Sequence, residues 1–194
     1  HFMPEIYFTE TTYQGIDFSS AGIPAGAYED CRFLNCVFTG CDLSSFRFSD
    51  CEFQDCDLSN TRVADTALQE VIFRNCKLLG IDFSDCRLFR FKVDFVNSQL
   101  NWASFQALPM KGTRFENCQL IETDFTQANL EEAVFDRANL AGAVFFRTNL
   151  VGADFRTAHN FTIDPEENNL KKAQFSAHSL AGLLKKHQLR IEGV

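Results

Sequence analysis

Eight cysteines are the residues of this 194-residue chain best suited to chemistry, because a thiolate can bind a metal, attack a substrate or form a disulfide. No CxxC pair occurs, and the four histidines (His1, His159, His178, His187) stand outside the cysteine-bearing part of the chain. All but the last cysteine are spaced by multiples of five: Cys31, Cys36, Cys41, Cys51, Cys56, Cys76, Cys86 and Cys118. This regular placement predicts small buried side chains. We therefore expect reduced thiols, no metal site and no cofactor.

The other residues capable of catalysis form no recognisable motif. The chain has no Gly-rich phosphate loop, GxSxG or HExxH, and nothing places a histidine beside a nucleophile. Acidic side chains are numerous, but paired-carboxylate catalysis requires a cleft that encloses a substrate. The sequence predicts no catalytic residue and a protein that is not an enzyme.

The chain has an apolar residue at every fifth position, and this period predicts the kind of structural element that carries the cysteines and carboxylates. One register runs without exception from Tyr13 to Val93, and after a shift of two residues a second runs from Phe95 to Phe155. With 45% hydrophobic residues, thirty such positions in succession would arise by chance with a probability on the order of 10⁻¹⁰. The period differs from those of an amphipathic helix and a half-buried strand, which are 3.6 and 2. A short extended side followed by a bend fits a period of five.

A second inward position lies two residues before each centre and is occupied mainly by Cys, Thr and Ala, as a narrow interior requires. Short side chains that can hydrogen-bond the backbone at a bend stand between the two positions. These are Asp42, Asp57, Asp82, Asp124, Asn129, Asn139, Asn149 and Asp154. The pattern indicates a chain wound into a solenoid.

Several of these units resemble the A(D/N)Lxx motif of pentapeptide-repeat proteins, among them Ala138-Asn139-Leu140 and Ala153-Asp154-Phe155. The resemblance covers roughly residues 11–158. It implies an all-β solenoid in which four pentapeptides form each coil of a right-handed quadrilateral parallel β-helix. Phe and Leu alternate along the later centres, so a twenty-residue coil would stack like residues: Phe115, Phe135 and Phe155 in one column, and Leu100, Leu120 and Leu140 in the next. Roughly seven coils at a spacing of about 4.8 Å would make a rod about 35 Å long.

The sequence divides into three parts. Residues 1–3 (His1-Phe2-Met3) look like a tag remnant, residues 4–160 form the repeat region with a register shift near 93–95, and residues 161–194 form a C-terminal cap and dimerisation segment. No linker divides the repeats. No apolar stretch is long enough to span a bilayer and no secretory signal is apparent, so we expect a cytoplasmic protein without a membrane partner.

Acidic residues are concentrated in the first half, where residues 1–95 carry fifteen acidic and eight basic side chains. A twenty-residue coil places Asp30, Asp50 and Glu70 in one column, and Asp65 and Asp85 in a neighbouring one. These carboxylates have two interpretations. They keep a repeat rod soluble, or they imitate the charge of DNA and compete for a protein groove that normally binds the duplex. Direct binding to nucleic acid is not expected in either case.

The C-terminal segment departs from the repeats. Ser176 is placed to cap a helix that carries Leu180, Leu183 and Leu184 at helical spacing, with Gly182 allowing close approach. Leu189 and Ile191 then alternate with polar residues, which is typical of a short strand. This segment could close the end of the solenoid or join two copies of the chain.

The segment also resembles the C-terminal region of Qnr-type quinolone-resistance proteins and the related microcin immunity protein, through Phe161-Thr162-Ile163-Asp164-Pro165 and Ala181-Gly182-Leu183-Leu184. The resemblance implies a homodimer joined through Leu180, Leu183 and Leu184. It also implies binding to DNA gyrase and topoisomerase IV, protecting them from quinolones or other poisons. Unlike many Qnr proteins, this chain has no room for two long projecting loops, because its period shifts by only two residues. A repeat scaffold that binds another partner is the alternative hypothesis.

Overall fold

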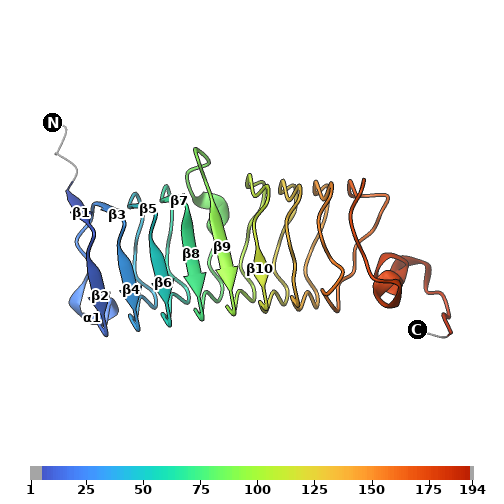
Figure 1. Cartoon of the computed structure of the whole chain (residues 1–194), viewed down its shortest axis with the longest axis horizontal. Coiled ribbons are helices and arrows are strands. Elements are labelled where there is room, and N and C mark those ends of the chain that lie inside the picture. The colour runs from blue at the N-terminus through green and yellow to red at the C-terminus, as the bar shows by residue number, and fades with distance from the viewer. Residues whose placement is uncertain (1–5, 193–194) are drawn as a thin grey trace.

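The chain forms a rod of stacked coils, as the computed structural model shows for residues 6–192 (Figure 1). The suggested tag remnant, residues 1–3, lies outside the described residues. Two parallel sheets run along the rod. The first contains β1 (Tyr7–Thr9), β3 (Ala27–Glu29), β5 (Arg47–Ser49) and β7 (Ala67–Gln69). The second contains β2 (Thr12–Gln14), β4 (Arg32–Leu34), β6 (Glu52–Gln54), β8 (Val71–Arg74), β9 (Val93–Val96) and β10 (Phe115–Glu116).

Each coil of the N-terminal half contains twenty residues, as the sequence predicted. Tyr7 pairs with Ala27, and Phe33 pairs with Phe53. Isolated parallel bridges continue the pairing where no strand is assigned. One such ladder passes through Asp17, Val37, Asp57, Lys77, Gln99, Gln119, Asn139 and His159. The fold is therefore the expected parallel β-solenoid, in which each coil is hydrogen-bonded to the coils before and after it.

The apolar centres fill the interior as continuous aromatic columns. The Phe115 and Phe135 rings stack with centroids 5.1 Å apart, and the Phe135 and Phe155 rings with centroids 4.6 Å apart. Neighbouring columns meet edge to face, with the Phe115 and Phe125 rings 5.6 Å apart at 81°. Both arrangements are favoured by the quadrupole of the aromatic ring. The predicted stacking of like residues on like is confirmed.

Short polar side chains fix the bends between the sides of each coil. Asp42 Oδ1 accepts a hydrogen bond from the Ser44 backbone N–H at 2.9 Å, and Asn149 Oδ1 accepts one from Val151 N–H at 3.2 Å. The same bond, to the N–H two residues ahead, is made by each of the Asp and Asn side chains predicted for this role: Asp57, Asp82, Asp124, Asn129, Asn139 and Asp154. The bend interpretation is confirmed for all eight. A helical turn follows the Asp82 bend, η1 (Phe83–Asp85), and another follows the equivalent bend at Asp17, α1 (Phe18–Ala21).

The two extra residues that shift the period lie in a loop, residues 87–92, and not at 93–95 as the sequence suggested. Arg87 N–H still bonds the Thr66 carbonyl, in the normal register, whereas Val93 already pairs with Val71, twenty-two residues away. Leu88 was expected to be an interior centre, but it is 57% exposed and Phe91 is buried near the same point. The loop contains a turn closed by a bond from Phe91 N–H to the Leu88 carbonyl, which is the bond that also closes ordinary corners of the coil, such as that from Phe46 N–H to the Leu43 carbonyl.

The C-terminal segment ends the rod with short 3₁₀ turns, η2 (Ala177–Leu183) and η3 (Lys185–His187). Gly182 is buried against Phe161, and a Cβ atom there would lie 2.6 Å from the Phe161 carbonyl oxygen, which confirms the predicted close approach. Two details of the expectation were wrong. The Ser176 side chain contacts Ser179 Oγ instead of capping the backbone, and no strand forms at Leu189 and Ile191. No helix within residues 6–192 has the length and apolar character needed to cross a bilayer.

The cysteines line the interior as free thiols, seven of them buried and Cys41 partly buried. The Sγ atoms of the seven buried cysteines lie within hydrogen-bonding distance of carbonyls of the previous coil, for example Cys51 with Tyr28 O at 3.3 Å. Burial raises the pKa of the Cys51 and Cys118 thiols to about 12. Residues 6–192 contain no group of three or more His, Cys, Asp and Glu residues placed to hold a metal ion.

We expect the native protein at pH 8 to react with iodoacetamide at no more than the partly exposed Cys41, because the other seven thiols are buried and enclosed. All eight cysteines should react once the protein is unfolded in urea. Intact-mass spectrometry before and after unfolding measures both numbers. A native mass that includes zinc, or that lacks the two hydrogens removed by each disulfide, would contradict the expectation.

Candidate partner-binding surface

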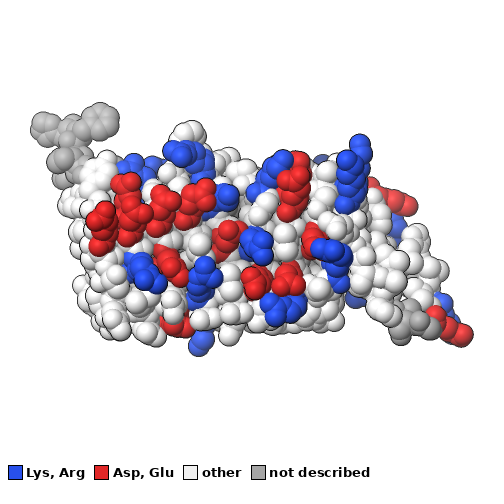
Figure 2. All heavy atoms as spheres, in the orientation of Figure 1, with Lys and Arg blue, Asp and Glu red and all other residues white. Residues whose placement is uncertain are grey.

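A column of four carboxylates at one corner of the rod forms the acidic ridge, which we define as Glu10, Asp30, Asp50 and Glu70. Asp30 N–H bonds the Ser49 carbonyl at 3.1 Å, and Asp50 N–H bonds the Gln69 carbonyl at 2.9 Å, so each residue lies directly beside its equivalent in the next coil. The spacing is that of adjacent parallel strands, about 4.8 Å. Figure 2 shows a row of acidic side chains along this N-terminal half of the rod. The sequence predicted the alignment of three of these residues; Glu10 is added by the structure.

The acidic ridge is exposed and mostly without compensating cations. Within residues 6–192 no ion pair involves Glu10, Asp30 or Asp50, and Glu70 lies 3.8 Å from Lys92 Nζ. Glu29 is also exposed and lies beside the ridge on β3. The ridge therefore presents several charges of one sign in a row.

Asp65 and Asp85 also share a column, since Asp65 N–H bonds the Asp85 carbonyl at 2.8 Å. However, Asp65 forms a bidentate ion pair with Arg87, whose Nε and Nη2 lie 2.8 and 2.9 Å from the two carboxylate oxygens. These bonds hold the pKa of Asp65 below its ordinary value. Asp65 is thus neutralised, whereas Asp85 is exposed and has no ion pair within residues 6–192, and the second predicted column is separate from the acidic ridge.

The geometry of the corner does not by itself require acidic residues. Every ridge residue has a left-handed backbone, with φ of 52° at both Asp30 and Asp50 and 53° at Glu70. Asn adopts this conformation at least as readily as Asp, and Glu does so less readily. An adjacent corner column with the same conformation is mostly Asn: Asn35, Asp55, Asn75, Asn97 and Asn117. The left-handed backbone of the turn therefore does not explain why the ridge positions carry carboxylates.

The later coils have a different surface, in which most charges are paired. Lys111 Nζ lies 2.9 Å from Glu131 Oε1, and Arg156 Nη2 lies 2.7 Å from Asp154 Oδ2. Arg137 contacts both Glu116 and Asp136 at 3.3 Å. The column of the acidic ridge itself continues to Lys92 and Gly112, so the ridge stops at the loop of residues 87–92.

Two family patterns match this repeat architecture. The pattern described as a pentapeptide repeat region matches residues 27–105, and the pattern described as pentapeptide repeats (8 copies) matches residues 98–137 and 123–159. Together they span residues 27–159. The chain belongs to the pentapeptide-repeat family.

Solved structures of other pentapeptide-repeat proteins have the same fold. A trypsin-treated variant of QnrB1, described as a plasmid-mediated fluoroquinolone resistance protein, superposes with a TM-score of 0.62 at 16% identity, covering 98% of this chain and 100% of that one. HetL from Nostoc sp. strain PCC 7120, described as involved in heterocyst differentiation regulation, gives a TM-score of 0.52 at 13% identity, covering 89% and 87%. No curated protein matches the sequence significantly. At these identities the likeness shows the fold alone.

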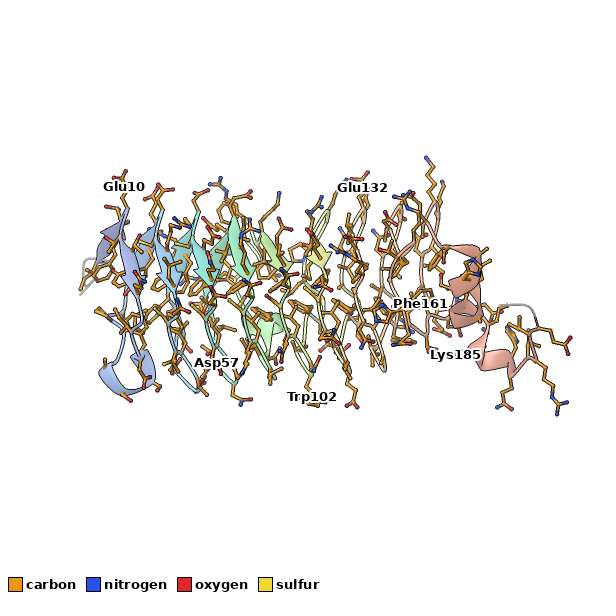
Figure 3. The ribbon with its side chains drawn as sticks, turned by 60° about the horizontal axis from the view of Figure 1, so that its bottom comes forward. Glu10, Asp57, Trp102, Glu132, Phe161 and Lys185 are labelled. Carbon is orange, nitrogen blue, oxygen red and sulfur yellow. The ribbon has the colours of Figure 1, made fainter. Side chains whose placement is uncertain are left out.

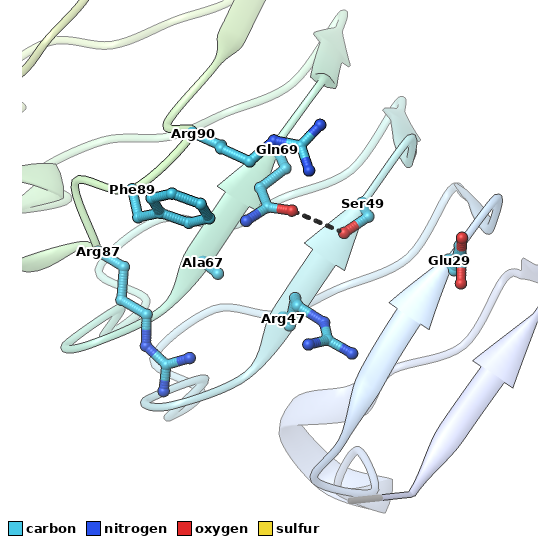
Figure 4. A pocket seen from close by; sticks show the side chains of 8 residues that line it. All are labelled: Glu29, Arg47, Ser49, Ala67, Gln69, Arg87, Phe89 and Arg90. Atoms are coloured by element: carbon cyan, nitrogen blue, oxygen red, sulfur yellow. Dashed lines mark hydrogen bonds between the residues drawn. The ribbon is translucent and has the colours of Figure 1, made fainter.

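The loop of residues 87–92 gives this pentapeptide-repeat rod a local projection beside the ridge. Phe89 at its tip is 76% exposed, and with Leu88 it forms an apolar pair on the surface. Below it lies a groove of about 380 Å³, lined by Arg47, Ser49, Ala67, Gln69, Arg87, Phe89, Arg90 and Glu29 (Figure 4). Sequence reasoning missed this site, because Leu88 satisfied the five-residue period by residue type.

The leucines of the C-terminal segment do not form one exposed stripe. Leu183 packs against the core of the last coils, whereas Leu180 and Leu184 remain 44% and 37% exposed. The tail is anchored by Lys186, whose Nζ lies 2.8 Å from Asp164 Oδ1 and 2.6 Å from Glu166 Oε2. Of the three predicted dimer residues, Leu180 and Leu184 are the most exposed to a second pentapeptide-repeat chain, and Leu183 is only partly exposed.

Proposed function

We propose that this protein binds DNA gyrase and topoisomerase IV through its acidic ridge, in place of DNA, and protects these enzymes from quinolones or other poisons. It acts by contact, without catalysing a reaction. The observation that carries the proposal is the row of exposed and largely uncompensated carboxylates in register along the first coils.

The ridge has the charge pattern that a DNA-binding groove recognises without regard to sequence. Phosphates along one DNA strand are spaced by about 3.4 Å of helix rise, and the ridge carboxylates by about 4.8 Å. A basic groove attracts such an array over a distance and increases the rate of association. Each exposed charge contributes little alone, about 0.2–1 kcal/mol, so the effect depends on several charges acting together.

The fold that this chain shares with QnrB1 supports the choice of partner, because QnrB1 is described as a fluoroquinolone resistance protein. A supercoiling assay tests the proposal directly. Purified gyrase is incubated with relaxed plasmid and ciprofloxacin, with and without this protein, and the supercoiled product is measured. We expect the protein to restore supercoiling in the presence of the drug. An unchanged inhibition curve at a large molar excess of the protein would contradict the proposal.

A scaffold that binds a different protein is the second candidate function. It is favoured by the exposed Leu88 and Phe89 on the loop of residues 87–92, which suit a partner with an apolar surface. HetL has the same fold and is described with a regulatory role. Absence of any effect on gyrase and topoisomerase IV, with loss of another partner in a Phe89→Ala variant, would favour this candidate.

We expect the functional unit to be a homodimer joined through the C-terminal segment, because Leu180 and Leu184 leave apolar surface exposed beside the last coil. Replacing both with Glu should give a monomer at micromolar concentration, as measured by sedimentation velocity. The matched control replaces Leu88 and Phe89 with Glu at the loop and should remain dimeric. A wild-type protein that is already monomeric, or a dimeric Leu180→Glu, Leu184→Glu variant, would exclude this interface.

A further inference from the structure

A cleft lies at the junction of the last coils and the C-terminal segment, where Figure 3 labels Phe161 and Lys185. Its volume is about 470 Å³, which is in the range of sites for small molecules. One wall is formed by residues 156–161 and the other by η2 and the start of η3. We infer that this cleft binds a small organic phosphate, independently of the acidic ridge.

The polar lining of the cleft favours an anion. His159, His178 and Lys185 line it, and none of its twelve lining residues within the described part of the chain is acidic. The nearest carboxylates of the tail, Asp164 and Glu166, are both engaged by Lys186. Within residues 6–192 no ion pair involves His159, His178 or Lys185. The chain as a whole has a net charge of −8, so the basic lining of the cleft is opposite in sign to the rest of the molecule.

The donors present favour a phosphate over a carboxylate. A carboxylate is recognised best by the two parallel N–H groups of an arginine. Arg156, the one arginine among the described residues that line the cleft, already uses these groups on Asp154, with Nε 3.0 Å and Nη2 2.7 Å from its carboxylate oxygens. The remaining side-chain donors are single groups on both walls, namely Lys185 Nζ and the two imidazoles, because the Ser179 hydroxyl already donates to the Ser176 carbonyl and the Ser176 hydroxyl to Ser179 Oγ. Separate donors of this kind suit the several oxygens of a tetrahedral phosphate.

The floor of the cleft favours a ligand with an apolar body attached to the phosphate. Ala181, which is partly exposed, lines it together with the nearly buried Phe161 and Ala158, and Gly182 holds the far wall in place. The Gly182 carbonyl accepts a hydrogen bond from Ile163 N–H at 3.1 Å, and a side chain at position 182 would clash with Phe161. The two walls are therefore fixed relative to each other before any ligand binds.

Isothermal titration of the full chain with phenyl phosphate, at constant ionic strength, tests the inference. Two comparison ligands are titrated in parallel. Inorganic phosphate lacks the apolar body, and benzoate keeps the apolar body but carries a planar carboxylate in place of the phosphate. We expect saturable binding of phenyl phosphate, weaker binding of inorganic phosphate and the weakest binding of benzoate. No saturation with phenyl phosphate, or benzoate binding equally well, would overturn the inference.

Two matched variants test the location. Lys185→Gln should weaken phenyl phosphate binding about tenfold, because it removes a charge-assisted hydrogen bond. Lys171→Gln removes the same charge from an exposed position outside the cleft and should change the affinity by less than about twofold. Both side chains are exposed, so both variants should keep the wild-type melting temperature. Equal weakening by the two variants would show binding by net charge and would also overturn the inference.

Discussion

Replacing Phe53 with alanine is expected to reduce the free energy of unfolding by about 3–5 kcal/mol, among the largest effects available to a single substitution. The Phe53 ring is 1% exposed and lies in the middle of an aromatic column, stacked on Phe33 at 4.6 Å and on Phe73 at 5.1 Å. It also meets Phe38 and Phe48 edge to face, at 5.6 and 5.4 Å. Because these rings are held by the backbone ladders of adjacent coils, the space left by the substitution cannot close easily.

Urea or thermal unfolding followed by circular dichroism measures this change. Gln54→Ala is the control, since Gln54 is the next residue of the same strand and points away from the interior, where its side chain contacts Asp55 at 3.1 Å. It should cost less than about 0.5 kcal/mol. Equal losses of stability in the two variants would mean that the interior and exterior positions of the coil are misassigned.

Reversing the charge of the acidic ridge is expected to abolish protection of gyrase while leaving the fold intact. A triple variant with Asp30→Lys, Asp50→Lys and Glu70→Lys should bind gyrase about 30-fold more weakly or worse, because three attractive charges become repulsive. The backbone should accept the new residues, because Lys172 already adopts the left-handed conformation with φ of 61°. Binding of the wild type should also weaken as salt is raised, since exposed charges are screened. Surface plasmon resonance at several salt concentrations gives both results.

A second triple variant controls for net charge. Glu122→Lys, Glu167→Lys and Glu192→Lys make the same change in charge at exposed positions outside the column of the ridge. This protein should bind and protect nearly as well as the wild type. Similar losses in both triple variants, or wild-type binding that does not depend on salt, would exclude imitation of DNA by the ridge.

The fold of the repeat region could be predicted because the period of its apolar residues is set by which side chains point into the interior. An apolar residue every fifth position and Asp or Asn at each bend leave few alternatives to a coil of four equal sides. The alignment of Asp30 with Asp50 followed from the same period, but their exposure and their lack of ion pairs within residues 6–192 did not. Asp65 shows the limit: it has the same spacing as the ridge residues, yet Arg87 neutralises it from the next coil.

The features that were missed lie where local sequence permits two arrangements. Between residues 87 and 92, Leu88, Phe89 and Phe91 are all apolar, so composition cannot tell which one enters the core. The structure places Phe91 inside and exposes the other two. The C-terminal segment has helical spacing, but contact of Gly182 with Phe161 and the pairing of Lys186 with Asp164 and Glu166 accompany short 3₁₀ turns instead of a regular α-helix. Tertiary contacts of this kind leave no periodic signal.

Each coil pairs only with its two neighbours, so the length of this protein can change in steps of one coil. A duplication of twenty residues adds one complete coil, lengthens the molecule by about 4.8 Å and returns every later residue to its former face. An insertion of any other length must be absorbed locally, as the two extra residues at 87–92 are. A row of surface charges on such a scaffold can therefore be extended or shortened by gene duplication and deletion, with its spacing unchanged. The number of charges in the row can therefore change, whereas the distance between neighbouring charges stays fixed by the spacing of the coils.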